Sequence, residues 1–194
     1  MDSERARSPL VGEPLAVDLA NTLEIYEGAY TVDFLLSTGG LSDWLELESG
    51  RLEGWTPVTD GDLSETRALR AAIRGLFEAL VSGSVPPEPP EDGVRRINAA
   101  SAGAPTHPEL DCSGARLRVR TRGDGASSAS SLAAVARSAI EVAGGHVRGA
   151  LRVCEAPGCP RLFLATKSQR RWCSEACGNR ARVARHYRRY RASR

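Results

Sequence analysis

The sequence predicts a mainly α-helical protein with a small β element, in which a multihelical domain precedes a compact cysteine-rich module. Three observations support this fold class. Apolar residues recur at helical spacing in the first 150 residues, one short segment alternates apolar and charged residues, and four of the five cysteines crowd into residues 154–177. We therefore expect a helical domain over residues 1–150 and a second module over residues 151–194, which suits a chain of 194 residues.

The first two helices are predicted near the start of the chain. Leucines recur at every fourth position from Leu15 within Pro14–Leu23, a spacing that favours a buried helix over a strand. A short second helix is expected over Leu41–Leu47, with Ser42 as its N-cap and a carboxylate in its first turn.

The segment Asp62–Val81 has the clearest helical pattern. Arg67, Arg70 and Arg74 lie largely outside its apolar stripe, so we expect them on the solvated face. The proline-rich run Val85–Pro90 ends this helix and is predicted to be a surface connector. The stripe comprises Leu69, Ile73, Leu76, Phe77 and Leu80.

A short strand and one more helix complete the body. In residues 116–122 four arginines alternate with Leu117, Val119 and Thr121, which predicts a strand with one solvated face before the turn at Gly123–Gly125. A charged sheet edge that resists aggregation is the commoner use of such arginines, and contact with nucleic acid is the alternative. Ser131–Ala143 is predicted to be helical.

Three polar residues form the one candidate ligand pocket in the body. Asp18, Asn21 and Glu24 are spaced so that they share one side of the first helix. Capping and internal hydrogen bonding explain these residues equally well, so both interpretations stay open.

No residue pattern in the body indicates catalysis. His107 is expected in a proline-flanked loop and His146 after a glycine pair, both as surface side chains rather than metal ligands. Cys112 stands alone and is interpreted as an incidental thiol. Because no nucleophile–base pair is apparent, we expect that the protein is not an enzyme.

The cysteine spacing predicts a metal site. Cys154 and Cys159 form one close pair, and Cys173 and Cys177 form a second. Zinc binds four thiolates tetrahedrally, and two short pairs can each present two sulfurs to one ion. Two disulfides or four buried thiols are the alternatives. Four cysteines leave no open coordination position, so we expect one structural zinc ion rather than a catalytic one.

The residues around the cysteines predict a treble-clef-like zinc finger. Pro157-Gly158 suits a tight knuckle between the first two cysteines, and Leu162–Leu164 suits the return strand of a hairpin. Ser174 is a credible N-cap, which would place Cys173 and Cys177 on the first turn of the following helix.

The charge distribution predicts a polyanionic partner. Residues 152–194 contain twelve Arg or Lys and two acids, whereas residues 1–151 contain fourteen bases and twenty-two acids. Seven arginines lie in residues 178–194, where Val183, Tyr187 and Tyr190 form a narrow stripe expected to lean on the zinc module or the body. An acidic body with a basic tail is typical of nucleic-acid binding.

Candidate DNA contacts lie on this last helix. Arginine neutralises phosphates and can grip guanine bidentately. Two alternatives stay open: a protein-interaction or scaffold module whose basic helix docks on an acidic surface, and an RNA-binding factor. The candidate contacts are Arg180, Arg182, Arg185 and Arg189.

Two segments resemble known families. Trp172–Arg182, with the sequence WCSEACGNRAR, together with the upstream cysteines and Leu162–Leu164, strongly resembles the CGNR zinc-finger family. Gly12–Leu23, with the sequence GEPLAVDLANTL, resembles the opening of the ABATE domain that precedes this finger. The resemblance implies a bacterial, stress-related transcriptional regulator with the four cysteines as zinc ligands.

The resemblance also assigns roles to the residues after the last cysteine. Asn179 would cap or brace the knuckle, and Arg180 would pair with a phosphate or with the anionic tetrathiolate. The chain departs from the family pattern at Ala165, where many members carry an acid, and in having one residue fewer between the last two cysteines. The shorter spacing still suits zinc, since both sulfurs remain on one helical turn.

The leading functional hypothesis is a DNA-binding transcriptional regulator whose first domain senses a small-molecule ligand or forms a homodimer. No stretch approaches the roughly 20 apolar residues that span a bilayer, and no apolar segment follows the acidic start Met1–Glu4. We therefore expect a cytoplasmic protein without a membrane partner.

Overall fold

The computed structural model describes residues 9, 12–26, 31–52, 57–82, 91–112, 116–123, 125, 127–167 and 169–192. These residues form six α-helices and three two-stranded antiparallel sheets, so the predicted mainly helical class with small β elements is confirmed. The helices are α1 (Leu15–Ala20), α2 (Thr38–Leu47), α3 (Asp60–Val81), α4 (Glu91–Ala102), α5 (Ser128–Gly144) and α6 (Glu175–Ala192), with a 3-10 turn η1 (Arg148–Ala150).

Each sheet is a single hairpin. In the β3–β4 hairpin Leu110 lies opposite Val119, and in the β5–β6 hairpin Arg152 lies opposite Phe163. The strands are β1 (Leu23–Ile25), β2 (Thr31–Asp33), β3 (His107–Asp111), β4 (Arg118–Arg122), β5 (Leu151–Val153) and β6 (Leu162–Leu164).

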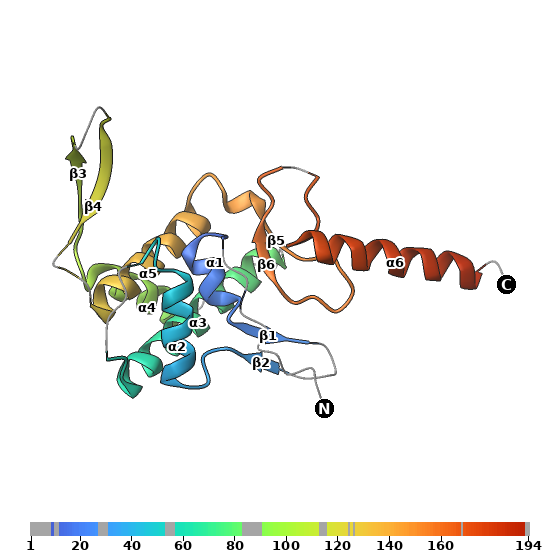
Figure 1. The fold of residues 1–194 in the computed structure, drawn as a ribbon, viewed down its shortest axis with the longest axis horizontal. Helices are drawn as coiled ribbons and strands as arrows, with labels where there is room; N and C mark the ends of the chain where they lie inside the picture. Colours follow the sequence, from blue (N-terminus) through green and yellow to red (C-terminus); the bar gives the residue numbers. More distant parts are fainter. Residues whose placement is uncertain are drawn as a thin grey trace.

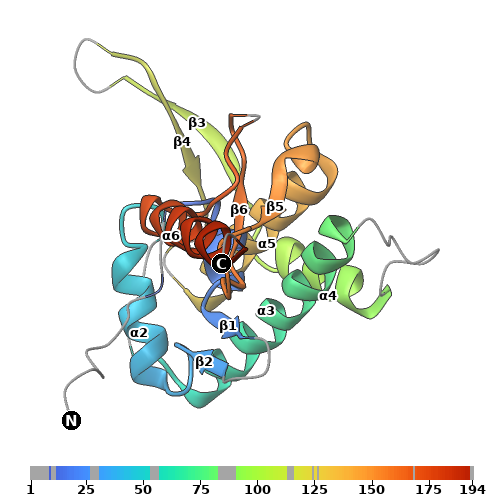
Figure 2. The same cartoon turned by 90° about the vertical axis from the view of Figure 1, so that its right-hand side faces the viewer.

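Helices α1, α3, α4 and α5 pack around one core, while β3–β4 and α6 extend from opposite ends of this body (Figure 1). Figure 2 shows α6 pointing toward the viewer, away from the body helices. None of the helices in the described part of the chain combines the length and apolar composition that a membrane-spanning segment requires. Large buried side chains of the core include Leu19, Leu35, Leu41, Leu69, Ile73, Phe77 and Ile97.

Capping residues fix where the body helices begin. Thr59 and Asp62 form a capping box that starts α3 two residues before the predicted position, and Ser127 starts α5 in the same way. The predicted N-cap of the second helix is wrong. Ser37 caps α2, while Ser42 lies inside the helix and donates a hydrogen bond to the Thr38 carbonyl at 3.0 Å.

Other element predictions also need correction. The first helix ends at Ala20, because the chain turns at Thr22, whose hydroxyl donates to the Leu19 carbonyl, and the next residues form β1. His107 is exposed, as expected, but lies on β3 rather than in a loop. Helix α4 was not predicted from the sequence, and the predicted connector Val85–Pro90 lies outside the described residues.

Two arginines predicted on the solvated face of α3 are buried instead. Arg70 donates to both carboxylate oxygens of Asp33 at 2.6 and 2.8 Å, and Arg74 donates to the Ala20 carbonyl at 3.0 Å and to Glu78 at 2.6 Å. The β1–β2 hairpin and the end of α1 cover this side of α3. Their carboxylate and carbonyl groups supply partners that the helix sequence alone does not show.

The Arg70–Asp33 pair gives the first prediction. Burial alone would raise the pKa of Asp33, but hydrogen bonds from Arg70 and the Leu35 amide, with the positive charge of Arg70, lower the pKa below its ordinary value. The pair therefore stabilises the fold above about pH 4, and this stabilisation is lost as pH falls through the lowered pKa. We expect Asp33→Asn to reduce the free energy of unfolding by about 3 kcal/mol at pH 7.

Urea unfolding of both proteins at pH 7 and pH 3 tests this prediction, and the difference between them should shrink at pH 3. Asp43→Asn, on the exposed face of α2, is the matched control and should change stability by less than about 0.5 kcal/mol. An Asp33→Asn effect that stays the same at both pH values would contradict the assignment.

Candidate metal centre and basic helix

Four cysteine sulfurs converge at one point of the finger. The Sγ atoms of Cys154, Cys159, Cys173 and Cys177 all lie within 4.8 Å of one another. Cys173 and Cys177 are 3.5 Å apart, and each lies 3.8 Å from Cys159. A tetrahedron with metal–sulfur bonds of about 2.3 Å has edges of about 3.8 Å, whereas a disulfide needs about 2.05 Å. The separations fit a shared metal ion and not disulfides.

The first cysteine pair is held by a tight turn after β5. The Cys154 amide donates to the Arg161 carbonyl at 2.9 Å, and the Cys159 amide donates to the Ala156 carbonyl at 3.0 Å. Gly158 adopts a φ of 68°, a left-handed conformation that glycine tolerates best. The predicted knuckle is therefore present, and it points both sulfurs to the same side.

The second pair lies where α6 begins. The Cys177 amide donates to the Ser174 hydroxyl at 3.2 Å, which confirms Ser174 as a cap, and the Cys173 amide donates to the Cys154 sulfur at 3.4 Å. Because α6 starts at Glu175, Cys173 precedes the helix instead of lying on its first turn as predicted.

Two contacts explain the residues that follow the last cysteine. A Cβ atom on Gly178 would lie 3.2 Å from the Trp172 ring, so glycine lets the indole close over the start of α6. Arg180 donates to the Cys177 sulfur at 3.2 Å and places a positive charge beside the thiolate cluster.

The sulfurs perturb one another strongly. Hydrogen bonds from Cys159 and Cys173 lower the pKa of Cys154 to about 2, and the same interaction with Cys154 raises the pKa of Cys159 to about 11. Hydrogen bonding to Cys154 also raises the pKa of Cys173. Protein groups alone thus favour one thiolate among neighbouring thiols. A divalent cation at the centre would balance the charge of further thiolates, which is the chemistry of a structural zinc site.

Comparison with protein families identifies both parts of the chain. Residues 13–146 match the ABATE family, described as "Putative stress-induced transcription regulator". The chain belongs to the ABATE family. Residues 150–190 match the CGNR zinc finger, and this match with the four convergent cysteines confirms the predicted cofactor, one zinc ion. No protein with a curated description matches the chain.

Polar residues of the ABATE segment hold the CGNR finger in place. The Asn21 amide nitrogen donates to the Leu162 carbonyl at 2.9 Å, and its oxygen accepts from the Leu162 amide at 2.9 Å, both in a buried setting. Asn21 therefore pairs with β6 as a neighbouring strand would. Glu24, only 1% exposed, accepts from the Arg161 Nε at 2.5 Å beside this pairing.

Arg170 links the finger to the body through one guanidinium group. Its nitrogens donate to the carbonyls of Leu164 and Cys173 at 3.0 and 2.9 Å and to the Glu13 carboxylate at 2.8 Å. The same guanidinium lies 4.8 Å from the centre of the Phe163 ring, a cation–π contact. Glu13 also accepts from the Leu164 amide at 2.9 Å, so one carboxylate binds both a strand and a side chain of the finger.

A second carboxylate cluster lies beside this junction. Arg51 donates to Asp18 at 2.5 Å and to Glu48, and Asp18 also accepts from the Gly12 amide at 2.9 Å. Burial and the nearby charge of Asp18 raise the pKa of Glu48 to about 7, and burial also raises the pKa of Asp18. The two carboxylates thus share one guanidinium inside the body.

The three residues of the predicted ligand pocket occupy this junction. Asp18 and Asn21 line a cavity of about 240 Å³ between the ABATE segment and the finger, and Glu24 is not among its described lining residues. All three bind protein groups, so a ligand role stays a prediction. The roles of Glu13, Arg161 and Arg170 were not predicted from the sequence. Glu13 lies in the ABATE-like opening, but its partner is 157 residues away, and no local pattern indicates such a pairing.

The basic face of α6 is open to solvent. Arg180, Arg182, Arg185 and Arg189 are all exposed, and Arg182 donates to Asn179 along the helix rather than Asn179 bracing the knuckle. Among the described residues, no arginine of α6 forms an ion pair with a carboxylate. The predicted packing of the apolar stripe is wrong, since Val183, Tyr187 and Tyr190 are 55%, 64% and 52% exposed.

Substitution of one of the four clustered cysteines gives the second prediction. We expect one zinc ion per chain in the wild-type protein and much weaker zinc binding in Cys177→Ser, because a water or hydroxyl in the fourth position binds zinc less tightly than a thiolate does. Metal analysis and thermal unfolding measure this, and the variant should unfold at a lower temperature. Cys112→Ser, at the exposed free thiol, should keep both zinc and stability. Zinc affinity and thermal stability of Cys177→Ser equal to those of the wild type would contradict the ligand set.

The Asn21–Leu162 pairing gives the third prediction. Asn21→Ala leaves a buried amide and a buried carbonyl without partners, so we expect a loss of about 2–4 kcal/mol in the free energy of unfolding. Urea unfolding of the zinc-loaded protein measures this loss. Asn98→Ala, on the exposed face of α4, is the matched control. Equal stability of the two variants would show that the pairing contributes nothing.

Proposed function

We propose that this ABATE-family protein is a zinc-dependent, DNA-binding transcriptional regulator and not an enzyme. The observation that carries the proposal is the exposed cationic surface of α6, which projects from the body and is not neutralised by described carboxylates (Figure 1). Duplex DNA supplies the phosphates that such a surface needs. The membership of a regulator family supports the same role, and four cysteine ligands leave the zinc ion without an open position for catalysis.

The proposed zinc ligands are Cys154, Cys159, Cys173 and Cys177. Zinc would not contact DNA; it would fix the start of α6 against the β5–β6 hairpin, which is itself bound to the body through Asn21. The direction in which the arginines point would therefore depend on the metal. The ABATE segment would sense a ligand or form a homodimer, and the protein would act in the cytoplasm.

The proposed DNA contacts are Arg180, Arg182, Arg185 and Arg189. Arg185 and Arg189 have no hydrogen-bond partner among the described residues, whereas Arg180 already binds the Cys177 sulfur. We therefore propose that Arg185 and Arg189 contact phosphates and bases directly and that Arg180 mainly steadies the metal centre.

An interaction module is the alternative. In it α6 docks on the body of the same chain or on an acidic partner; the exposure of the arginines argues against the first version, and an acidic protein partner stays the alternative to DNA. RNA binding is the other alternative, because Tyr187 and Tyr190 are exposed among the arginines and can stack on unpaired bases.

The fourth prediction measures DNA binding against salt. Phosphate contacts by Arg182, Arg185 and Arg189 should give a slope of log binding constant against log salt of about −2.7, and Arg185→Gln/Arg189→Gln should reduce it to about −0.9. Fluorescence anisotropy with zinc-loaded protein and random duplex DNA measures both slopes. Arg95→Gln/Arg96→Gln removes two exposed charges from α4 and should leave the slope unchanged.

Two results would overturn the proposal. The first is the absence of duplex binding above background at low salt. The second is stronger binding to single-stranded or structured RNA in competition, which would assign α6 to RNA.

A further inference from the structure

A cavity of about 550 Å³ lies at the base of the β3–β4 hairpin, where β4 meets the first turns of α5. Four arginines line it, and no described residue of its lining is acidic. Two of the four, Arg120 and Arg122, belong to the alternating arginines of β4, which the proposed DNA-binding helix leaves unexplained. The other two are Arg51 and Arg137.

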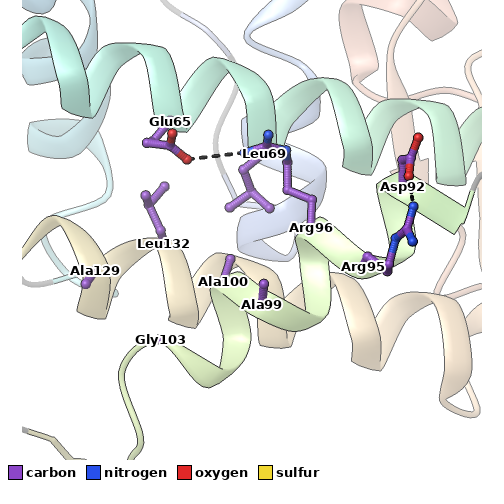
Figure 3. Close-up of a pocket in the computed structure, with 10 residues that line it drawn as sticks. All are labelled: Glu65, Leu69, Asp92, Arg95, Arg96, Ala99, Ala100, Gly103, Ala129 and Leu132. Carbon is purple, nitrogen blue, oxygen red and sulfur yellow. Dashed lines mark hydrogen bonds and ion pairs between the residues drawn. The ribbon is translucent and has the colours of Figure 1, made fainter.

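The cavity differs from the other large hollow of the body. That hollow, about 780 Å³, lies along α4 (Figure 3). Its arginines are matched by acids of the same lining, since Arg95 pairs with Asp92 and Arg96 donates to Glu65 at 3.2 Å. Glu65 and Asp92 thus stand in the wall of that hollow, where their carboxylates would repel an anion.

Three arginines of the hairpin-base cavity can be redirected to a ligand, whereas Arg51 stays bound to the buried carboxylates of Asp18 and Glu48. Arg137 donates to the carbonyls of Ser101 and Ala104, both at 3.1 Å, and forms no ion pair with a described carboxylate. Arg120 and Arg122 pair with Asp111 and Glu109 at 2.6 Å, but both arginine side chains are more than half exposed. Ion pairs at such exposure are weak, so a dianion can replace them.

The start of α5 adds a favourable dipole, although the Ser130 hydroxyl itself donates to the Ser127 carbonyl at 2.9 Å. Ser130 and Ser131, in the first turn of this 17-residue helix, line the cavity beside Thr121 of β4. The N-terminal end of a helix carries partial positive charge and favours anions. Leu52 and Ala134 provide an apolar wall, and the volume exceeds what one inorganic phosphate fills.

We propose that this cavity binds a small molecule that carries a phosphate group. A tetrahedral dianion has enough acceptors for two guanidinium groups and the Thr121 hydroxyl at once, whereas a carboxylate has two oxygens. The organic part of the ligand lies against Leu52 and Ala134. This site is separate from α6 and does not depend on the proposed DNA binding.

Isothermal titration of the zinc-loaded full chain with pyrophosphate at fixed ionic strength tests the proposal. We expect saturable binding of one pyrophosphate per chain and a dissociation constant raised about tenfold or more in Arg120→Gln/Arg122→Gln. Both side chains are largely exposed, so this variant should fold. Bound zinc is measured before and after each titration, so that metal extraction is not counted as binding.

Two controls locate the binding. Arg185→Gln/Arg189→Gln should bind pyrophosphate as the wild type does, which separates the cavity from the DNA-binding helix. Acetate at the same ionic strength should not compete. Binding lost in the α6 variant but kept in Arg120→Gln/Arg122→Gln, equal competition by acetate, or no saturable binding at millimolar pyrophosphate would each overturn the proposal.

Discussion

Strand β6 is buried on both faces, and the arrangement of the two family segments depends on it. Leu162 and Leu164 belong to the core of the body, while Phe163 between them packs in the core of the finger with two of the metal-site cysteines. Burial of each leucine contributes about 2 kcal/mol. The edge of β6 that faces α1 pairs with Asn21, so backbone and side chains of one short strand bind both segments at once.

Charge is divided between this junction and the outer surface. The body carries a net negative charge by sequence, yet two of its carboxylates near the finger are already paired with arginines of the same chain. Glu13 binds Arg170, and Glu24 binds Arg161. Arg161 and Arg170 of the finger thus form ion pairs that attach the finger to the body. The arginines of α6 lie beyond the reach of these carboxylates, because the helix projects away from the body (Figure 2). Opposite charges within one chain therefore do not cancel, and the basic helix stays available to an external polyanion.

The sequence predicted those features that depend on residues close to one another in the chain. It predicted the apolar faces of α3 and α5, the cysteine pairs and the Ser174 cap. Each of these involves residues within a few helical turns of one another. The buried Arg70 and the exposure of Tyr187 were not predicted, since each depends on whether a distant element covers that position, and the strand at His107 was not predicted because it forms by pairing with β4. The same holds for the metal centre: the convergence of its four cysteines follows from their spacing, whereas its attachment through Asn21 and Arg170 joins residues about 140 to 157 apart.

The junction also links the metal to the body thermodynamically. The two family matches meet near residue 150, but the core of the body includes Leu151, Leu162 and Leu164, which follow that point. Without the finger, these leucines would leave the core and Asn21 and Glu24 would lose their buried partners. Zinc stabilises the finger, and an ordered finger in turn completes the body. Linkage is reciprocal, so any change that loosens Asn21 or Glu13 must weaken the finger, and with it zinc binding, by the same free energy that zinc contributes to their order. In the proposed regulator, this linkage through β6 would let a change in the order of the body alter the order of the finger that carries α6.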